Sequence, residues 1–497
     1  MRIRFAVFVG QTNCTELIRI GGTRFGSRKT PNEWSFASTI EEMKFCQARP
    51  TAKMSRLLVA IAGILSLAPM ACAQDWFKTE TSSGVSNIRI AVADFKPVSA
   101  ADPQTTSLKR TFDTTLYNDL SNAGIFDMVS KSMLPQVTPG APGEISLAQW
   151  STAPTSAAMV AFGALGSSGG RLTVSGYLFD AKNAQFPQVL AKQYSEDASD
   201  DMARQIAHRF ADEIIFRLGG GVPGIAETKI YYVKISGGNK EIWTMDYDGA
   251  NQHAITKLGT VSISPRVAPD NSRIAFSSLG RDGFQIRMYS LLLNRVVNFA
   301  SSGGTNLSPA WSPNGRDIAF SSSRSGDPEI WIADSGGGGS HRVTSFRGPD
   351  VSPVFNPKTG SQIAWISGRT GLPQLYIMDA DGSAVTRMTD GGYATSPSWS
   401  PNGQFLAFAW DRKYGPGAPG GQDIYVMEVA TKRWIQITHD IGRCDFPSWS
   451  PDGRHLVFAN APNGRASSTR IVSTLADGTG RKVLTEAASD MPNWSWK

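Results

Sequence analysis

The sequence predicts a small N-terminal α/β domain followed by an all-β six-bladed β-propeller that is closed by its C-terminal strand. Three observations support this. A motif of the form Pro-x-Trp-Ser-Pro-Asn/Asp-Gly, exact or loosened, recurs six times in the second half of the 497-residue chain. Helically spaced apolar residues precede the motif, within residues 85–220. The first repeat lacks its inner strand, and the last repeat consists of an inner strand alone, so the two together can form one blade.

The six motif copies begin at regular intervals and define the blades. They start at Pro265, Pro309, Pro353, Pro397, Pro447 and Pro492, 44 to 50 residues apart, which is the period of propeller blades. In the three fullest copies, at Pro309, Pro397 and Pro447, Pro-x-Trp-Ser predicts a short strand, and the proline and glycine that follow predict a turn. The copies at Pro265 and Pro353 are looser, and the sixth stops before the turn. The tryptophans at 311, 399, 449 and 494 share one phase of the repeat. We expect them to pack one blade on the next, because buried aromatic area stabilises such stacks.

Ring closure follows from the two ends of the repeat array. The last copy supplies an inner strand at 490–496 with nothing after it, whereas the strand patterns from Lys229, Glu241 and Ala254 have no inner strand before them. We therefore expect one composite blade built from both ends, which leaves no open sheet edge.

The N-terminal part of the chain, before residue 74, is predicted to contain a targeting segment. Ten Lys/Arg and four Asp/Glu lie before residue 74, so most of the net charge of +7 is outside the rest of the chain. This argues against a nucleic-acid partner. A basic start at Met54, an apolar run and a small-residue site predict cleavage between Ala73 and Gln74. The apolar run is too short for stable membrane insertion, and Cys72 fits a lipid-attachment pattern poorly.

We divide the chain accordingly. The segments are 1–53, an upstream extension that we interpret as untranslated, with a genuine extension as the alternative; 54–73, a signal peptide; 74–86, an exposed N-terminal segment; 87–220, the α/β domain; 221–228, a linker; and 229–497, the propeller. In the α/β domain we expect strands at 88–95, 172–179 and 189–194 and helices at 107–123 and 200–218.

Catalytic, cofactor and metal sites are not predicted. The stretch from Gly166 to Gly170 matches Gly-x-Ser-x-Gly but lies between two predicted strands, so we expect a hairpin turn and not a nucleophile elbow. The five histidines at 208, 253, 341, 439 and 455 lack metal-ligand spacing. After signal cleavage only Cys444 remains. Without a readable histidine partner we expect it to be structural.

Polar residues just before the inner strands form the predicted partner site. They are Asn306, Asp350, Thr395, Asp445 and Asp490. Propeller symmetry places loops of this kind at one mouth of the central channel, where they could receive a basic or polar segment of a partner, or a cation. The alternative is that these residues only cap strand ends.

Together, the secretion signal, the small α/β domain and the closing repeats resemble the TolB family of the Tol-Pal system. The resemblance covers residues 74–497 and implies a periplasmic, non-enzymatic scaffold active in cell division and outer-membrane integrity. It implies a Pal-like peptidoglycan-associated lipoprotein at one propeller face and a TolA-like inner-membrane protein at the N-terminal segment. Ser83, Gly84 and Val85 match the family just before the first strand, whereas the residues upstream match weakly.

Two other functions remain as alternatives. One is a TolB-like paralogue that binds another envelope protein or a glycan. The other is the propeller of a peptidase, which needs a further hydrolase domain of about 200 residues. We expect no cofactor and a monomeric protein.

Overall fold

The structure is a computed structural model that describes residues 87–99, 102–300, 303–414, 421–486 and 488–496. The predicted signal peptide, its cleavage site and the N-terminal segment lie outside the described residues. The site residues predicted in these segments are Ala73, Gln74, Ser83, Gly84 and Val85.

The α/β domain contains one sheet with strands in the order β3-β1-β4-β5-β6, and β2 pairs with β4. The strands are β1 (Ile88–Val92), β2 (Lys96–Pro97), β3 (Phe126–Met128), β4 (Met159–Ser168), β5 (Arg171–Asp180) and β6 (Gln188–Asp197). The helices are α3 (Pro103–Asn122), α4 (Leu147–Ser151) and α5 (Asp200–Leu218), with 3-10 turns at Lys131–Met133 and Pro142–Glu144. Strands β2 and β3 and helix α4 are not among the sequence predictions, and β4 is the strand expected before the turn at Gly166 to Gly170, for which no bounds are predicted.

Helix α5 begins and ends where the sequence predicts, whereas α3 begins earlier. The carboxylate of Asp102 accepts hydrogen bonds from the backbone N–H groups of Gln104 and Thr105, and Pro103 occupies the first helical turn. Both features favour a helix start at this point, ahead of the predicted Ser107. At the other end, Gly124 follows the helix with a φ of +72°, the left-handed conformation in which glycine commonly ends a helix.

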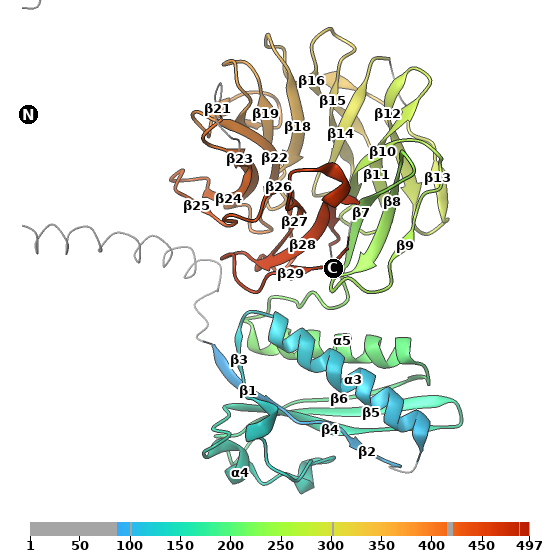
Figure 1. The fold of residues 1–497 in the computed structure, drawn as a ribbon, viewed down its shortest axis with the longest axis vertical. Coiled ribbons are helices and arrows are strands. Elements are labelled where there is room, and N and C mark those ends of the chain that lie inside the picture. The colour runs from blue at the N-terminus through green and yellow to red at the C-terminus, as the bar shows by residue number, and fades with distance from the viewer. Residues whose placement is uncertain (1–86, 100–101, 301–302, 415–420, 487, 497) are drawn as a thin grey trace, which may run out of the picture. The chain divides into compact units, whose positions relative to one another are not determined.

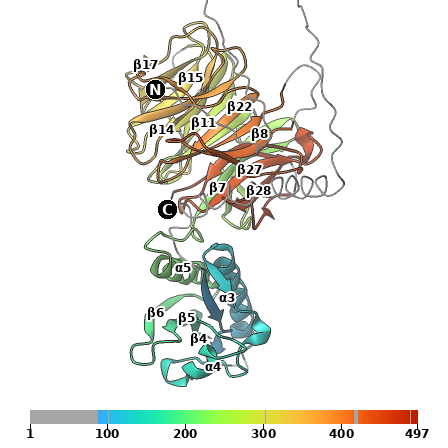
Figure 2. The same cartoon turned by 90° about the vertical axis from the view of Figure 1, so that its left-hand side faces the viewer.

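The two long helices lie side by side over the same face of the sheet, as Figures 1 and 2 both show. Their apolar stripes meet at Phe95, which contacts Phe112 of α3 and Phe210 of α5 with ring centroids 4.6 and 6.1 Å apart. Gly163 on β4 lies against Phe95, since a Cβ there would come within 2.5 Å of its ring and 2.0 Å of the Ser175 carbonyl oxygen. This strand therefore carries glycine because the aromatic core needs the space.

The propeller consists of six four-stranded antiparallel sheets. Four of them are β10 (Ser262–Val267), β11 (Arg273–Gly280), β12 (Gly283–Ser290) and β13 (Arg295–Val297); β14 (Asn306–Trp311), β15 (Asp317–Ser322), β16 (Glu329–Asp334) and β17 (His341–Arg342); β18 (Asp350–Phe355), β19 (Gln362–Ser367), β20 (Gln374–Asp379) and β21 (Thr386–Arg387); and β22 (Tyr393–Trp399), β23 (Phe405–Asp411), β24 (Asp423–Glu428) and β25 (Trp434–Gln436). A fifth comprises β26 (Arg443–Trp449), β27 (His455–Ala461), β28 (Arg470–Leu475) and β29 (Lys482–Val483), with a 3-10 turn at Ala466–Ser468.

The sixth sheet confirms the predicted ring closure. It is formed by β30 (Ser489–Trp494), β7 (Lys229–Ser236), β8 (Asn239–Asp246) and β9 (His253–Ala254), in that order. Strand β30 pairs antiparallel with β7, so that Trp494 lies opposite Ile230 and Asp490 opposite Val233. The last described strand thus supplies the inner strand of the blade to which the first three propeller strands, β7, β8 and β9, belong.

The motif tryptophans pack between blades, as predicted. Trp311 is 8% exposed and lies in one cluster with Met288 and Phe299 of the preceding blade and Phe320 of its own. Its indole Nε1 also donates to the Arg266 carbonyl oxygen of the preceding blade, at 3.0 Å. Each such ring adds apolar area to the contact between blades, and Trp399 adds a second hydrogen bond of this kind, from Nε1 to the Val354 carbonyl oxygen at 3.2 Å.

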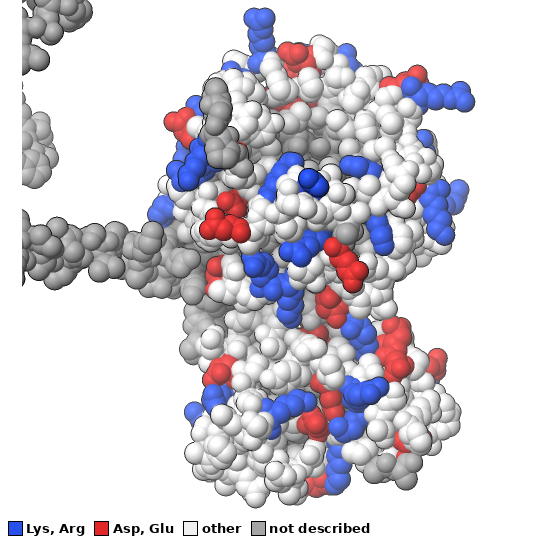
Figure 3. All heavy atoms as spheres, in the orientation of Figure 1, with Lys and Arg blue, Asp and Glu red and all other residues white. Residues whose placement is uncertain are grey.

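The described surface gives no sign of a membrane span or of a large region of one charge in the view of Figure 3. None of the described helices is both long and apolar enough to cross a membrane. On the face shown in Figure 3, Lys and Arg are interspersed with Asp and Glu.

Candidate functional site

The six inner strands form a closed ring. Each of β10, β14, β18, β22, β26 and β30 contacts the next, and β30 contacts β10. All five predicted partner residues lie near the first residue of an inner strand, so the structure places them toward one end of this ring.

A bulge interrupts every inner strand just before the motif proline. The pairing register shifts there in each of the six sheets. The residue before the proline has a φ of 48 to 55°, and these residues are Ser264, Ser308, Ser352, Ser396, Phe446 and Met491. Left-handed backbone is unfavourable for residues other than glycine. Its recurrence in all six blades shows that the bulge is part of the repeat, where it redirects the chain toward the channel mouth.

The predicted site residues occupy two registers and do not form one ring. Asn306 and Asp350 stand three residues before the motif proline, whereas Thr395, Asp445 and Asp490 stand two residues before it. Successive side chains of a strand point to opposite faces of its sheet. The five residues therefore separate into a buried pair and a group of three.

Asn306 and Asp350 are buried, Asn306 against the preceding blade and Asp350 within its own blade. Asn306 is 2% exposed, and its side-chain nitrogen donates to Gln285 Oε1 at 2.8 Å. Asp350 is fully buried and accepts from Arg369 Nη2 at 2.9 Å. These contacts correspond to the strand-capping alternative for this pair.

Thr395, Asp445 and Asp490 lie on three neighbouring inner strands, and the first two are joined by a hydrogen bond. Asp445 Oδ1 accepts from the hydroxyls of Thr395, at 3.2 Å, and Ser396, at 2.8 Å. Its Oδ2 pairs with Arg443 Nη2 at 3.0 Å. Burial raises the pKa of Asp490, and the nearby charge of Asp445 raises it further. A cationic or hydrogen-bond-donating partner group near Asp490 would favour its ionised form.

The other half of the same register is apolar. In β10, β14 and β18 the residues two before the motif proline are Ile263, Leu307 and Val351, and all three are half-buried. The mouth of the ring therefore presents acidic and hydroxyl groups on three consecutive blades and aliphatic groups on the other three. A surface of this kind suits a peptide or protein partner that brings both apolar and basic side chains.

The chemistry elsewhere is structural in character. Gly166 to Gly170 form the end of β4 and its turn into β5, as predicted, with Ser168 paired to Arg171. Cys444 is fully buried, and burial raises the pKa of its thiol to about 12. Such a thiol is a poor nucleophile. Within the described ranges, no group of three or more His, Cys, Asp or Glu side chains is placed to hold a metal ion.

Two histidines are buried against carboxylates, which the sequence alone did not reveal. His208 Nδ1 lies 2.7 Å from Asp119 Oδ2. His455 Nδ1 lies 3.0 Å from Asp452 Oδ2, and its Nε2 lies 2.7 Å from the Asn122 carbonyl oxygen. Both ring nitrogens of His455 thus face acceptors, so this imidazole can donate two hydrogen bonds only in its protonated form.

Comparison with known proteins identifies the family. The sequence profile described as the TolB beta propeller domain matches residues 217–496, and the profile of the TolB amino-terminal domain matches residues 81–186. The first match alone covers more than half of the chain. The chain belongs to the TolB family.

Curated relatives carry the same assignment. A Tol-Pal system protein TolB of Gluconobacter oxydans is 31% identical over 355 residues, which cover 70% of this chain and 75% of that protein. A TolB homolog of Chlorobium chlorochromatii is 31% identical over 202 residues, or 40% of this chain and 44% of the relative. The crystal structure of TolB from Acinetobacter baumannii matches with a TM-score of 0.69 at 23% identity, covering 83% of this chain and 97% of that one, which shows the shared fold.

Three features of the site were missed in the sequence of this TolB-family chain. The bulge had a signal, since a serine precedes the proline in four of the six copies. The split of the predicted site residues into two registers could also have been found, because Asn306 and Asp350 stand three residues before the motif proline and the other three stand two residues before it. The amphipathic mouth appears only when the six equivalent positions are compared.

Proposed function

We propose that this chain is a periplasmic, non-enzymatic scaffold of the Tol-Pal system that joins partner proteins of the two membranes. In this role it contributes to outer-membrane invagination during division and to envelope integrity. Membership of the TolB family supports a role of this chain in the Tol-Pal system. The observation that carries the scaffold role is the half-acidic, half-aliphatic mouth of the inner-strand ring, which offers a binding surface without a reactive constellation.

We propose that this mouth receives a Pal-like peptidoglycan-associated lipoprotein. The aliphatic half at Ile263, Leu307 and Val351 would bury apolar side chains of the partner. The acidic half at Asp445 and Asp490 would accept from its basic or polar groups. Apolar contact supplies most of the affinity in such an interface, and the charges set orientation and partner choice.

A second contact is proposed for the N-terminal segment. Residues 74–86, which include Ser83, Gly84 and Val85, would bind a TolA-like inner-membrane protein, since an exposed segment of this length can add itself to a partner's sheet. Export depends on cleavage between Ala73 and Gln74. Amino-terminal sequencing of the protein recovered from the periplasm tests that position directly.

The mouth is tested by two isosteric substitutions. The double variant Asp445→Asn/Asp490→Asn keeps side-chain size but removes both charges, and we expect affinity for the Pal-like lipoprotein to fall by about tenfold, with little change in melting temperature. Asp381→Asn, in the exposed turn between β20 and β21, serves as the matched control. Calorimetry with the purified lipoprotein is the measurement, and unchanged affinity of the double variant would remove the mouth from the interface.

The division of labour is tested by deletion. A protein that lacks residues 74–86 should lose TolA binding and retain Pal binding, and loss of Pal binding instead would contradict the proposal. A pull-down from envelope extracts separates the Tol role from the paralogue alternative. Recovery of an unrelated envelope protein or a glycan, without a Pal-like lipoprotein, would favour that alternative.

A further inference from the structure

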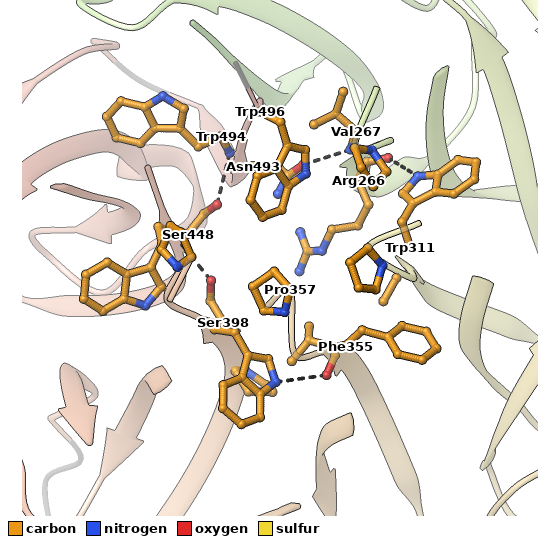
Figure 4. Close-up of a pocket in the computed structure, with 18 of the residues that line it drawn as sticks. Arg266, Val267, Trp311, Phe355, Pro357, Ser398, Ser448, Asn493, Trp494 and Trp496 are labelled. Atoms are coloured by element: carbon orange, nitrogen blue, oxygen red, sulfur yellow. Dashed lines mark hydrogen bonds between the residues drawn. The ribbon is translucent and has the colours of Figure 1, made fainter. Parts of the chain in front are cut away.

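A small cavity lies in the inner-strand ring near the ends of the inner strands, away from the acidic mouth. Six of its lining residues are equivalent, because each directly follows a motif proline in the position written x above. These six, which we call the x ring, are Arg266, Ala310, Val354, Ser398, Ser448 and Asn493. The cavity has a volume of about 110 Å³. Figure 4 shows Arg266 reaching toward its middle.

The walls of the cavity are apolar and aromatic. A second set of equivalent residues, four positions after the motif proline, forms a collar around it: Pro269, Pro313, Pro357, Pro401 and Trp496. In the last repeat Trp496 thus stands where the other repeats have the turn proline. These walls can contact an alkyl chain but cannot hydrogen-bond to a bound group, apart from the indole N–H of Trp496.

The polar members of the x ring have their oxygens engaged by the backbone of the next blade. Ser448 Oγ accepts from the Trp494 N–H at 3.0 Å, and Asn493 Oδ1 accepts from the Val267 N–H at 2.9 Å. Ser398 Oγ accepts a longer bond of 3.4 Å from the Trp449 N–H. These bonds are drawn in Figure 4. The hydroxyl hydrogens and the amide NH₂ of the three residues remain as donors.

Arg266 brings a charge into this donor-rich cavity, and none of the described residues forms an ion pair with it. It is the only charged residue among the described residues that line the cavity. The one hydrogen bond of its guanidinium to a described residue runs from Nη1 to the adjacent Pro265 carbonyl oxygen, at 3.1 Å. The residue is half-buried, and the surrounding protein lowers the pKa of the guanidinium to about 10, so the group is still charged at neutral pH. A charge that is partly withdrawn from water is unfavourable unless it is paired.

We infer that the x ring is a binding site for a carboxylate with a short aliphatic stem. The guanidinium of Arg266 would pair with the carboxylate oxygens, and Ser398, Ser448 and Asn493 would donate to them. The alkyl stem would lie against Pro357 and Trp496. Arginine forms a fork that matches a carboxylate in two parallel hydrogen bonds.

Cavity size and charge favour this ligand over larger or more highly charged anions. A volume of this size corresponds to roughly three or four water molecules, enough for a carboxylate and two or three carbons. A single guanidinium neutralises a monoanion but leaves a phosphate dianion uncompensated. The carboxylate could belong to a free organic acid or to an acidic side chain of a peptide, and the two sources present the same chemistry to Arg266.

The binding assay uses the full chain and matched pairs of probes. Propionate is compared with propionamide, and acetyl-Gly-Glu-Gly-amide with acetyl-Gly-Gln-Gly-amide, at constant ionic strength. Calorimetry measures binding, and the tryptophan fluorescence of the cavity wall provides a second signal. We expect saturable binding of at least one carboxylate and none of its amide partner. Binding of propionate alone indicates a free acid, and binding of the Glu peptide alone indicates a peptide segment. Absence of saturable binding by both carboxylates overturns the inference.

Arg266→Met tests the assigned residue, with Arg316→Met on an exposed turn as the control. Methionine of similar length should reduce carboxylate affinity by about tenfold or more. It should leave the melting temperature unchanged or raise it, because it removes an unpaired enclosed charge. Carboxylate binding that survives Arg266→Met would place the ligand elsewhere. Should this variant not fold, Arg266→Lys, which keeps the charge without the fork, is expected to bind more weakly than the natural protein, and equal affinity would refute the assignment.

Discussion

Replacing Trp494 by alanine removes the anchor of the closing strand β30. The side chain is 3% exposed and packs against Val457 and Ile471 of the preceding blade and Ile230 of the adjacent strand. Its Nε1 donates to Thr228 Oγ1 at 2.8 Å. Truncating a buried tryptophan costs about 3–5 kcal/mol, and loss of the buried hydrogen bond adds about 1 kcal/mol. We therefore expect the free energy of unfolding to fall by about 4–6 kcal/mol, a large part of the stability of a typical domain.

Urea unfolding followed by near-ultraviolet circular dichroism measures this change. Trp434→Ala is the matched control: its ring is 38% exposed at the outer strand β25, where it stacks beneath Arg412, and its loss should cost about 1 kcal/mol. Deletion of residues 492–497 should lower cooperative stability further, because it leaves the edge of β7 unpaired. A loss below about 1 kcal/mol for Trp494→Ala, or an unchanged melting temperature for the deletion, would refute the view that β30 holds the ring closed.

Three further substitutions or modifications probe the interior. Burial alone would raise the pKa of Asp452, but the neighbouring His455 and Arg454 lower it to about 2. The ionised carboxylate therefore stabilises the folded protein above about pH 4, and this contribution to the free energy of unfolding is lost as the pH falls toward 2. Asp452→Asn should therefore cost about 2 kcal/mol in urea unfolding at pH 7 and almost nothing at pH 2, and a pH-independent difference would contradict this. Cys444, with its thiol pKa raised by burial to about 12, should resist iodoacetamide at pH 8 in native protein and react after unfolding, as read by peptide mass spectrometry; rapid native labelling would show the thiol to be accessible. Gly163→Ala forces a Cβ to within 2.0 Å of a backbone oxygen, whereas Gly143→Ala meets nothing within 4 Å; we expect a loss of about 3 kcal/mol or more against almost none, and equal melting temperatures would disprove the predicted clash.

Much of the fold was predictable because its signals are local and repeated. A proline and a glycine at fixed spacing specify a turn wherever they occur, and the regular interval between the copies extends the hairpin pattern to the looser ones. Helix α5 was predicted to the residue, since its cap, acidic start and glycine end are all adjacent in sequence. No bounds were predicted for the strand before the Gly166 turn, β4, because Gly163 and Gly166 weaken the strand pattern. The ring that takes the space at Gly163 is that of Phe95, which lies between β1 and β2.

The candidate site was predictable only in part. The sequence located Asp445 and Asp490 near the channel mouth, because inner strands start at the same point of every blade. It also grouped them with Asn306 and Asp350, which the alternation of side chains along a strand directs into the blade interior. The aliphatic half of the mouth was not predicted. A single aliphatic residue such as Ile263, Leu307 or Val351 is unremarkable in its own repeat, and the three form a set only when equivalent positions of the blades are compared.

By itself, the sequence determined the number of blades, the type of both domains and the closing strand β30, because each of these is recognised from a pattern within a few dozen residues. Only the tertiary structure decided which side chains share a surface. Arg266 and Asn493 are more than 200 residues apart, and closure of the ring brings them to one cavity. The charge of Arg266 looks ordinary in the sequence. It becomes notable only where the folded chain surrounds it with donors and apolar walls, because the energy of a charge is set by its neighbours in space.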